Sequence, residues 1–347
     1  MSTRAPRWAL VLALMALLAA GCAGGGTSDD GAGPAGPVSG ERPLQFEGAG
    51  NVRLFGTLTM PATQAGGAVP GALVILPTAA AAGLPGQAGT ANSVGRDLAT
   101  SIAAAGVAAY RYDQRGTGAS KVEPDIRLHF DDLVADGRAG LDLLAQRRET
   151  AGRELTVVGY DEGGLVALRL AATDNRVKRL VLVSAPGRSL VDVRAAQLQS
   201  RYGRESGDAL RTQVAALLSS RSLPPLDQLR TELRPLLPAQ EAAFLAELYG
   251  FDPAAEAVRV RVPTMIVVPA DAAPYDAQRL VGVIPGAHVV TSVGSGSTLS
   301  IELPAALTNA DSAQHLHDGP LPVAETKRDT AVIDAMAQFV AAGGGTR

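Results

Sequence analysis

From Leu44 onward the chain alternates short β-branched runs with longer alanine- and leucine-rich segments of helical period. This alternation is typical of a mostly parallel sheet with helices on both faces, an α/β fold. Eight runs have the length and composition of strands: Leu44–Glu47, Val52–Met60, Ala72–Leu76, Val107–Tyr112, Leu155–Gly159, Arg179–Val183, Thr264–Val268 and His288–Val293. We expect the first two to form an antiparallel hairpin. The others should alternate with helices near 92–106, 131–147, 163–173, 275–282 and 328–342.

The pattern changes between Gly187 and Val258. This region has no strand-like run, but it has several amphipathic segments. The clearest segments are Val191–Tyr202, Asp208–Leu218 and Gln240–Leu248. We expect a helical lid over the carboxyl ends of the strands, the edge at which open α/β sheets bind ligands. Seven arginines of this region are expected on solvated helix faces that can meet anionic lipid: Arg194, Arg201, Arg204, Arg211, Arg221, Arg230 and Arg234.

Residues 1–21 have the features of a lipoprotein signal peptide. Two arginines precede the apolar stretch Trp8–Ala20, which is shorter than the roughly 20 residues of a membrane-spanning helix. Small residues lead up to Cys22, which such a signal leaves for acylation, although an ordinary secretory signal is the alternative. Residues 22–43 predict a flexible tether rich in Gly, Pro and Ser. We expect a cell-envelope protein, anchored through Cys22 on the extracytoplasmic side of a bacterial membrane.

Composition narrows the classes of partner. The 347 residues include 31 Lys+Arg against 34 Asp+Glu, for a formal net charge of −3. Nucleic acid is therefore not an expected partner, because its phosphates require a basic excess. The single cysteine excludes an internal disulfide and any multi-cysteine metal site. We expect no metal and no cofactor, and one folded domain over residues 44–347.

The most informative motif is G-Y-D-E-G-G at Gly159–Gly164, which joins a buried strand run to a helical run. This is the setting of a nucleophile elbow, in which glycines allow a sharp turn and the middle residue projects from the helix N-terminus. The middle residue here is Asp161.

With this motif the chain resembles the α/β-hydrolase superfamily, and most closely the exported esterase and serine-aminopeptidase-like group whose elbow is G-H-S-E-G-G. Four further segments match that group's pattern: Tyr110–Ser120, Ser184–Leu190, Phe251–Pro253 and Ile284–Ala287. The resemblance covers nearly the whole chain after the tether. It implies an eight-stranded, mostly parallel sheet with flanking helices and a helical lid.

The resemblance also implies a serine nucleophile, a histidine base, an acid and an oxyanion loop, and most of these are changed. Asp161 stands at the nucleophile position and Ser297 at the base position. The oxyanion loop, Gly-Ser-Gly in the family, reads Pro77-Thr78-Ala79 here, so both glycines are replaced. Glu162 follows the nucleophile position. The acid position is kept as Asp271. The simplest interpretation is a pseudo-hydrolase of esterase-like ancestry, kept to bind a partner or a small apolar or peptidic ligand under the lid.

The alternative is an active hydrolase that uses Asp161 as nucleophile, as epoxide hydrolases do. Its base would be His315 or His317, on the connection between the last strand and the last helix. Its acids would be the lid tyrosines Tyr202 and Tyr249.

A dehalogenase is disfavoured, because Glu162 takes the place of the halide-binding tryptophan and the only tryptophan, Trp8, lies in the signal peptide. We expect His129 and His288 to be surface or packing residues. The carboxylates of Asp161, Glu162 and Asp271 should raise one another's pKa and could attract a cation.

Overall fold

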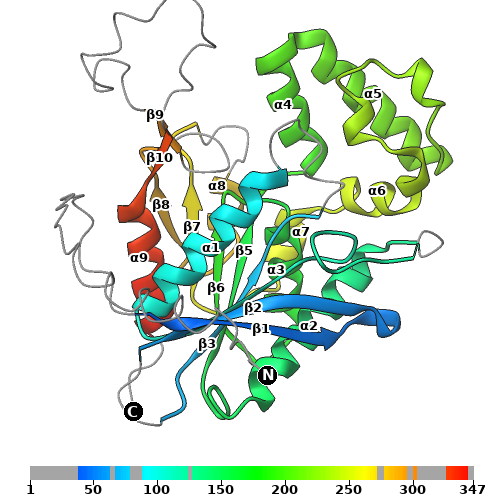
Figure 1. Ribbon diagram of the computed structural model, residues 1–347. Helices are drawn as coiled ribbons and strands as arrows, with labels where there is room; N and C mark the ends of the chain where they lie inside the picture. Colours follow the sequence, from blue (N-terminus) through cyan, green and yellow to red (C-terminus); the bar gives the residue numbers. More distant parts are fainter. Residues whose placement is uncertain are drawn as a thin grey trace, which may run out of the picture. The chain divides into compact units, whose positions relative to one another are not determined.

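The computed structural model describes residues 38–62, 67–78, 88–123, 127–271, 277–294, 300–302 and 326–342, all within one compact unit, Ala35–Arg347. Its centre is an eight-stranded sheet of order β1-β2-β4-β3-β5-β6-β7-β8 (Figure 1). The strands are β1 (Val38–Glu47), β2 (Arg53–Pro61), β3 (Gly71–Ile75), β4 (Ala108–Tyr112), β5 (Leu155–Tyr160), β6 (Val177–Val183), β7 (Thr264–Val268) and β8 (His288–Thr291). Only the pairings of β2 with β1 and β4 are antiparallel. The predicted fold class is confirmed.

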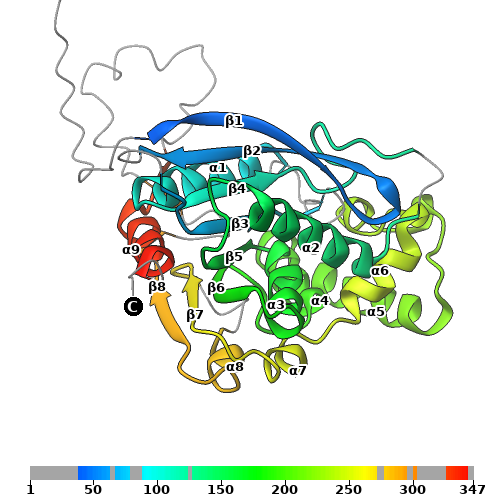
Figure 2. The same ribbon diagram turned by 90° about the horizontal axis from the view of Figure 1, so that it is seen from below.

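Helices cover both faces of the sheet, as Figures 1 and 2 show. On one face lie α2 (Phe130–Gln146) and α3 (Gly163–Thr173), and on the other α1 (Ala88–Ala104) and α9 (Thr330–Ala341). Every residue of β3, β5 and β7 is buried. This explains why these runs are continuously apolar in sequence and do not alternate.

The segment between β6 and β7, residues 184–263, is helical and is called the insertion below. It contains α4 (Leu190–Tyr202), α5 (Arg204–Ser220), α6 (Ala242–Tyr249), the short α7 (Pro253–Ala257) and three 3₁₀ turns. The insertion leaves from the carboxyl end of β6, which is the edge predicted to hold the site. Buried leucines of α4, α5 and α6, with Phe244 of α6, join the same apolar core as α2 and α3.

Several elements differ from the sequence-based expectation. β1 begins at Val38, ahead of the expected Leu44, and an edge strand tolerates the missing N–H of Pro43. A two-stranded sheet of β9 (Ser300–Glu302) and β10 (Thr326–Arg328) was not expected, because neither run is long enough to show a period. Helix α8 is shortened to Gln278–Val281.

Four predicted features lie outside the described residues: the signal peptide with Cys22, most of the tether, Ser297, and the pair His315 and His317. Within the described ranges, no helix has both the length and the apolar character needed to cross a bilayer.

Candidate active site

A sharp turn at Asp161, called the elbow below, joins β5 to α3. Asp161 follows β5 with a φ of 50°, a left-handed conformation that is costly for a residue with a side chain. Added methyl groups at Gly159 and Gly163 would collide with the backbone of Gly164 and Ile75, respectively. The two outer glycines of the motif are therefore required by close packing of α3 against the sheet, whatever residue stands between them.

A second strand end lies beside the elbow. Tyr160 is in register with Val183 on β6, so the next residues, Asp161 and Ser184, end adjacent strands. The backbone N–H of Asp161 donates to the carbonyl of Val183 at 2.9 Å. Ser184 also has a φ of 50°, and its hydroxyl is buried without a hydrogen-bond partner within the described structure. No motif in the sequence marks this hydroxyl as a site residue, because Ser184 belongs to a segment that matches the family pattern without a catalytic role.

Arg194 corrects one expectation of the sequence analysis. We expected a solvated helix face, but only 1% of its side chain is exposed, and Nη2 lies 3.5 Å from Oδ1 of the equally buried Asp161. Its Nη1 donates to Gln197 at 2.9 Å. The insertion therefore delivers a cation to the nucleophile position.

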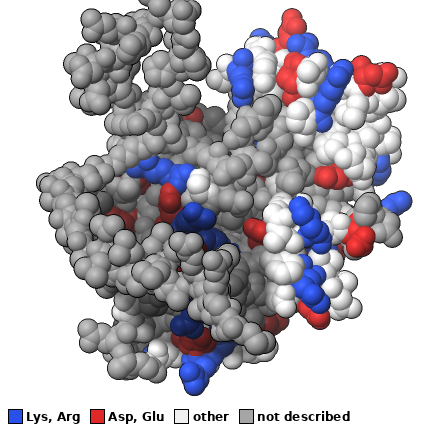
Figure 3. Space-filling model, viewed as in Figure 1, with Lys and Arg blue, Asp and Glu red and all other residues white. Residues whose placement is uncertain are grey.

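The other insertion arginines agree better with the expectation of a solvated surface. Arg211 pairs with Asp192 and Asp208, and Arg204 pairs with Asp208, at 3.3 to 3.4 Å. Figure 3 shows the result as blue and red side chains interspersed over the insertion. This surface carries both signs of charge.

Glu162 accepts hydrogen bonds from Thr78 of the oxyanion loop. The Thr78 hydroxyl donates to Oε1 of Glu162 at 2.9 Å, and the Thr78 backbone N–H donates to the same carboxyl. Burial raises the pKa of Glu162 to about 8, against the opposing effects of Arg194 and Thr78. The neighbouring Pro77 has no N–H to offer. Thus the described part of the loop directs its donors to a side chain of the protein itself.

The backbone carbonyl of Leu76, at the start of the oxyanion loop, also accepts a hydrogen bond from within the protein. Nε2 of Gln114, from the segment after β4, donates to the carbonyl of Leu76 at 2.8 Å, and Gln114 is buried. This contact fixes the path of the chain into Pro77. This hydrogen bond could not be predicted from the sequence, because Gln114 and Leu76 are 38 positions apart.

The two candidate tyrosines lie in different environments. Tyr249 on α6 is buried, donates to the carbonyl of Leu236 at 3.2 Å and lies close enough to Arg194 and Glu162 to feel their charges. Burial raises its pKa above the ordinary range for a phenol. Tyr202 is 42% exposed and lies under the guanidinium of Arg201. The structure therefore brings only Tyr249 to the cluster around Asp161.

Asp271 follows β7 at the carboxyl edge of the sheet, where the resemblance placed an acid, and its side chain is exposed. His288 opens β8, so it lies at the opposite, amino edge. His129 caps α2 and hydrogen-bonds Glu247 of the insertion. No group of three or more potential metal ligands occurs among the described residues.

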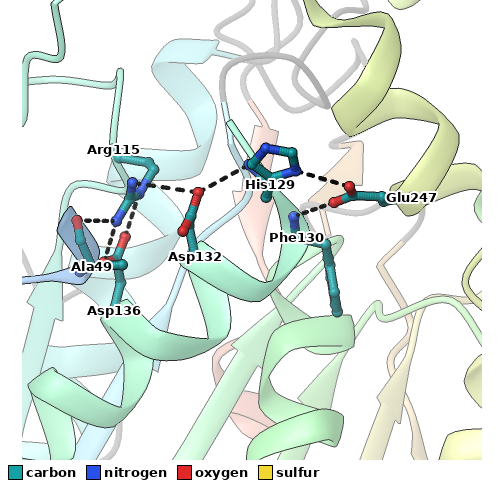
Figure 4. A network of polar contacts seen from close by, with 7 residues as sticks. All are labelled: Ala49, Arg115, His129, Phe130, Asp132, Asp136 and Glu247. Carbon is teal, nitrogen blue, oxygen red and sulfur yellow. Dashed lines mark hydrogen bonds and ion pairs between the residues drawn. The ribbon is translucent and has the colours of Figure 1, made fainter. Parts of the chain in front are cut away.

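A chain of polar contacts joins the insertion to the core beside this site (Figure 4). Glu247 of α6 accepts from the backbone N–H of Phe130 at 2.8 Å and contacts Nδ1 of His129 at 2.9 Å. Asp132 accepts from the His129 backbone and lies 3.8 Å from Arg115, which is paired with Asp136. The N-terminus of α2 thus holds the insertion through a carboxylate, as its dipole favours.

Comparison with known proteins agrees with this geometry. The family model described as alpha/beta hydrolase fold matches residues 72–267, more than half of the chain. The chain belongs to the α/β-hydrolase fold family. No curated protein matches its sequence.

Solved structures similar to this hydrolase-fold protein are remote in sequence. Proline iminopeptidase from Mycobacterium smegmatis is 16% identical, with a TM-score of 0.52 over 87% of this chain and 99% of that one. An acetyl xylan esterase from a Paenibacillus species is 15% identical, with a TM-score of 0.51 over 87% and 83%. An esterase domain from Rhodothermus marinus is 14% identical, with a TM-score of 0.50 over 87% and 99%. At these identities the similarity shows the fold alone.

Proposed function

We propose that this α/β-hydrolase-fold protein is a pseudo-hydrolase, exported and anchored through acylated Cys22, whose elbow serves to bind a ligand instead of cleaving one. The observation that carries the proposal is the buried contact of Arg194 with Asp161. A guanidinium on the carboxylate stabilises its charge and occupies the approach to it, and both effects oppose nucleophilic attack.

The oxyanion loop supports the same conclusion. In acyl transfer, donors must point at the oxygen that becomes charged in the transition state. Here the hydroxyl and N–H of Thr78 are directed to the Glu162 carboxyl, and Pro77 has no N–H. A substrate carbonyl would have to displace Glu162 to reach them. An ester hydrolase with a carboxylate nucleophile and an occupied oxyanion loop lacks two of the elements that its chemistry needs.

Hydrolysis assays test the proposal. The purified wild-type chain, Asp161→Ala and the matched control Asp227→Ala, at an exposed aspartate of the insertion, are given short acyl esters and aryl epoxides. We expect all three to hydrolyse these compounds at the rate of buffer. A wild-type rate that Asp161→Ala abolishes would overturn the pseudo-hydrolase proposal.

Anchoring is tested separately, by the intact mass of the chain purified from membranes. We expect a chain that begins at Cys22 and carries acyl groups, and we expect Cys22→Ala to abolish processing. An unmodified mature chain would favour the ordinary secretory signal.

One observation favours the alternative, an Asp161 nucleophile of the epoxide-hydrolase kind. Asp161 keeps the strained elbow conformation, and the buried Tyr249 lies near the cluster. If such activity exists, it should need a histidine, and His315→Ala and His317→Ala should be compared with His288→Ala, whose side chain lies at the opposite sheet edge. Loss in one of the first two only would establish this alternative.

A further inference from the structure

Asp161, Glu162 and Ser184, called the elbow cluster below, each have a buried polar side-chain atom without a hydrogen bond among the described residues. Oδ1 of Asp161, Oε2 of Glu162 and Oγ of Ser184 are buried and make no hydrogen bond within the described part of the chain. Asp161 and Ser184 end adjacent strands, and Glu162 follows in the chain. Buried polar atoms are almost always hydrogen-bonded, so these atoms are unusual. The raised pKa of Glu162 keeps its carboxyl neutral at pH 7, so the acceptors that can take a donor are Oδ1 of Asp161 and Oγ of Ser184.

A guanidinium lies next to one of these atoms, Oδ1 of Asp161. Nη2 of Arg194 is 3.5 Å from Oδ1 of Asp161, at ion-pair distance but without a hydrogen bond to that oxygen. The charge of Arg194 also acts on Glu162 and Tyr249. Arg194 is carried by α4 of the insertion, whereas Asp161 and Glu162 belong to the turn between β5 and α3. The contact therefore joins two parts of the fold and can be exchanged for a contact with another cation.

We propose that the elbow cluster is a binding site for an organic cation, a guanidinium or primary ammonium group on a peptidic or small ligand, and that Arg194 is its built-in occupant. The inference rests on the proposed function, since a ligand-binding elbow needs Asp161 as a counter-charge and not as a nucleophile. Guanidinium and ammonium groups carry only donors, which matches the Asp161 carboxylate and the Ser184 hydroxyl as acceptors.

Competition with Arg194 sets the strength of binding. A ligand can bind only to molecules in which Arg194 has left Asp161. Its apparent Kd is therefore the intrinsic Kd divided by the fraction of such molecules. Removing the Arg194 side chain removes this competition and leaves Asp161 as a buried carboxylate without a counter-charge. An added small cation should then stabilise the variant more than it stabilises the wild-type chain.

Chemical rescue tests this inference on the full chain. The unfolding midpoint of Arg194→Ala is measured with methylguanidinium, methylammonium or acetate, as chloride or sodium salts at equal ionic strength. We expect both cations to raise Tm by about 3–6 °C at tenfold their Kd, and to raise the wild-type Tm less. Sodium acetate should change Tm no more than sodium chloride does at the same ionic strength.

Two controls make the result specific. Arg211→Ala removes an exposed arginine of the insertion, which pairs with Asp192 and Asp208, and should respond as the wild type does. Arg194→Ala combined with Asp161→Asn should lose the rescue. Equal rescue of Arg211→Ala, or rescue by acetate, or none in folded Arg194→Ala, would overturn the cation site.

If Arg194→Ala does not fold, Arg194→Gln keeps amide donors and removes the competing cation. We expect it to bind methylguanidinium at least about tenfold more tightly than the wild type by calorimetry, and equal affinity would overturn the inference. These readouts need no turnover. Failure of the rescue in an inactive chain would defeat the cation site alone, whereas ester or epoxide hydrolysis through Asp161 would defeat the pseudo-hydrolase.

Discussion

The described part of the chain holds a buried arginine–aspartate pair at Arg115 and another at Arg194, and the two differ in how completely they are hydrogen-bonded. Arg115 donates to both oxygens of Asp136, at 2.7 and 2.5 Å, and to the carbonyl of Ala49 at 3.1 Å. Asp136 accepts a further bond from the Ala49 N–H at 2.8 Å. At the elbow, Arg194 is 3.5 Å from Asp161, and the facing oxygen has no hydrogen bond.

This difference separates a structural pair from a site. A buried ion pair offsets the cost of removing its charges from water only when its hydrogen bonds are complete. The Arg115 pair meets this condition and ties the loop after β4 to α2 and the turn after β1. The Arg194 pair leaves acceptors unmet and joins the insertion to the elbow, so it can be rearranged at lower cost.

The largest expected effect is at Arg115. Arg115→Met leaves Asp136 fully buried without its partner and should destabilise the protein by about 3–5 kcal/mol, measured by urea unfolding. The matched control is Arg138→Met, which removes an exposed arginine of α2 and should cost less than about 0.5 kcal/mol. A small loss at Arg115 would break the comparison.

The second prediction concerns Arg194. Arg194→Met should destabilise by about 2–3 kcal/mol, less than Arg115→Met, because fewer hydrogen bonds to the carboxylate are lost. In a double-mutant cycle with Asp161→Asn, the coupling energy should be smaller than in the cycle of Arg115→Met with Asp136→Asn. Equal coupling energies would mean that both pairs are structural.

The third prediction follows from the raised pKa of Glu162, which burial moves to about 8. The folded protein then binds more protons than the unfolded chain between the ordinary carboxyl pKa and pH 8, so stability should fall as pH rises through this window. We expect a loss of about 1–2 kcal/mol between pH 5 and pH 7 that is absent in Glu162→Gln. Parallel profiles for both proteins would show that Glu162 is charged in the folded state.

The smallest expected effect is at the contact of the insertion with α2. The hydrogen bond to Glu247 raises the pKa of His129. Its contribution should be fully present below the unfolded pKa of about 6.5 and should be lost as pH rises through the raised value. Because His129 is exposed, Glu247→Gln should cost only about 0.5 kcal/mol at pH 6 and less at pH 9. A pH-independent cost would assign the contact to the Phe130 N–H alone.

Most of the fold could be predicted from the sequence. Buried strands such as β5 and β7 are continuous apolar runs, and the Gly159–Gly164 turn marks where β5 passes into α3. The short strands β9 and β10 could not be predicted, because three residues do not establish a period.

The candidate site was predicted in part. Asp161, Pro77 and Glu162 were found because a motif fixes their positions in the chain. Arg194, the partner of Asp161, was not predicted, because most arginine side chains are exposed. Its spacing held the signal, since Arg194 lies four residues from both Leu190 and Leu198, which are buried on α4. A fully buried arginine almost always has a partner for its charge.

The most direct test of the account is oxygen-18 labelling of Asp161. If Asp161 attacks an epoxide carbon, the carbon–oxygen bond of the ring breaks and an alkyl ester of the enzyme forms. Water then attacks the carboxyl carbon of this ester, the diol leaves, and one solvent oxygen stays in the aspartate carboxyl. The wild-type chain is incubated with the epoxides in oxygen-18 water, digested, and the peptide that contains Asp161 is weighed. The account predicts the same mass with and without substrate. Substrate-dependent incorporation of oxygen-18 into Asp161 would contradict it.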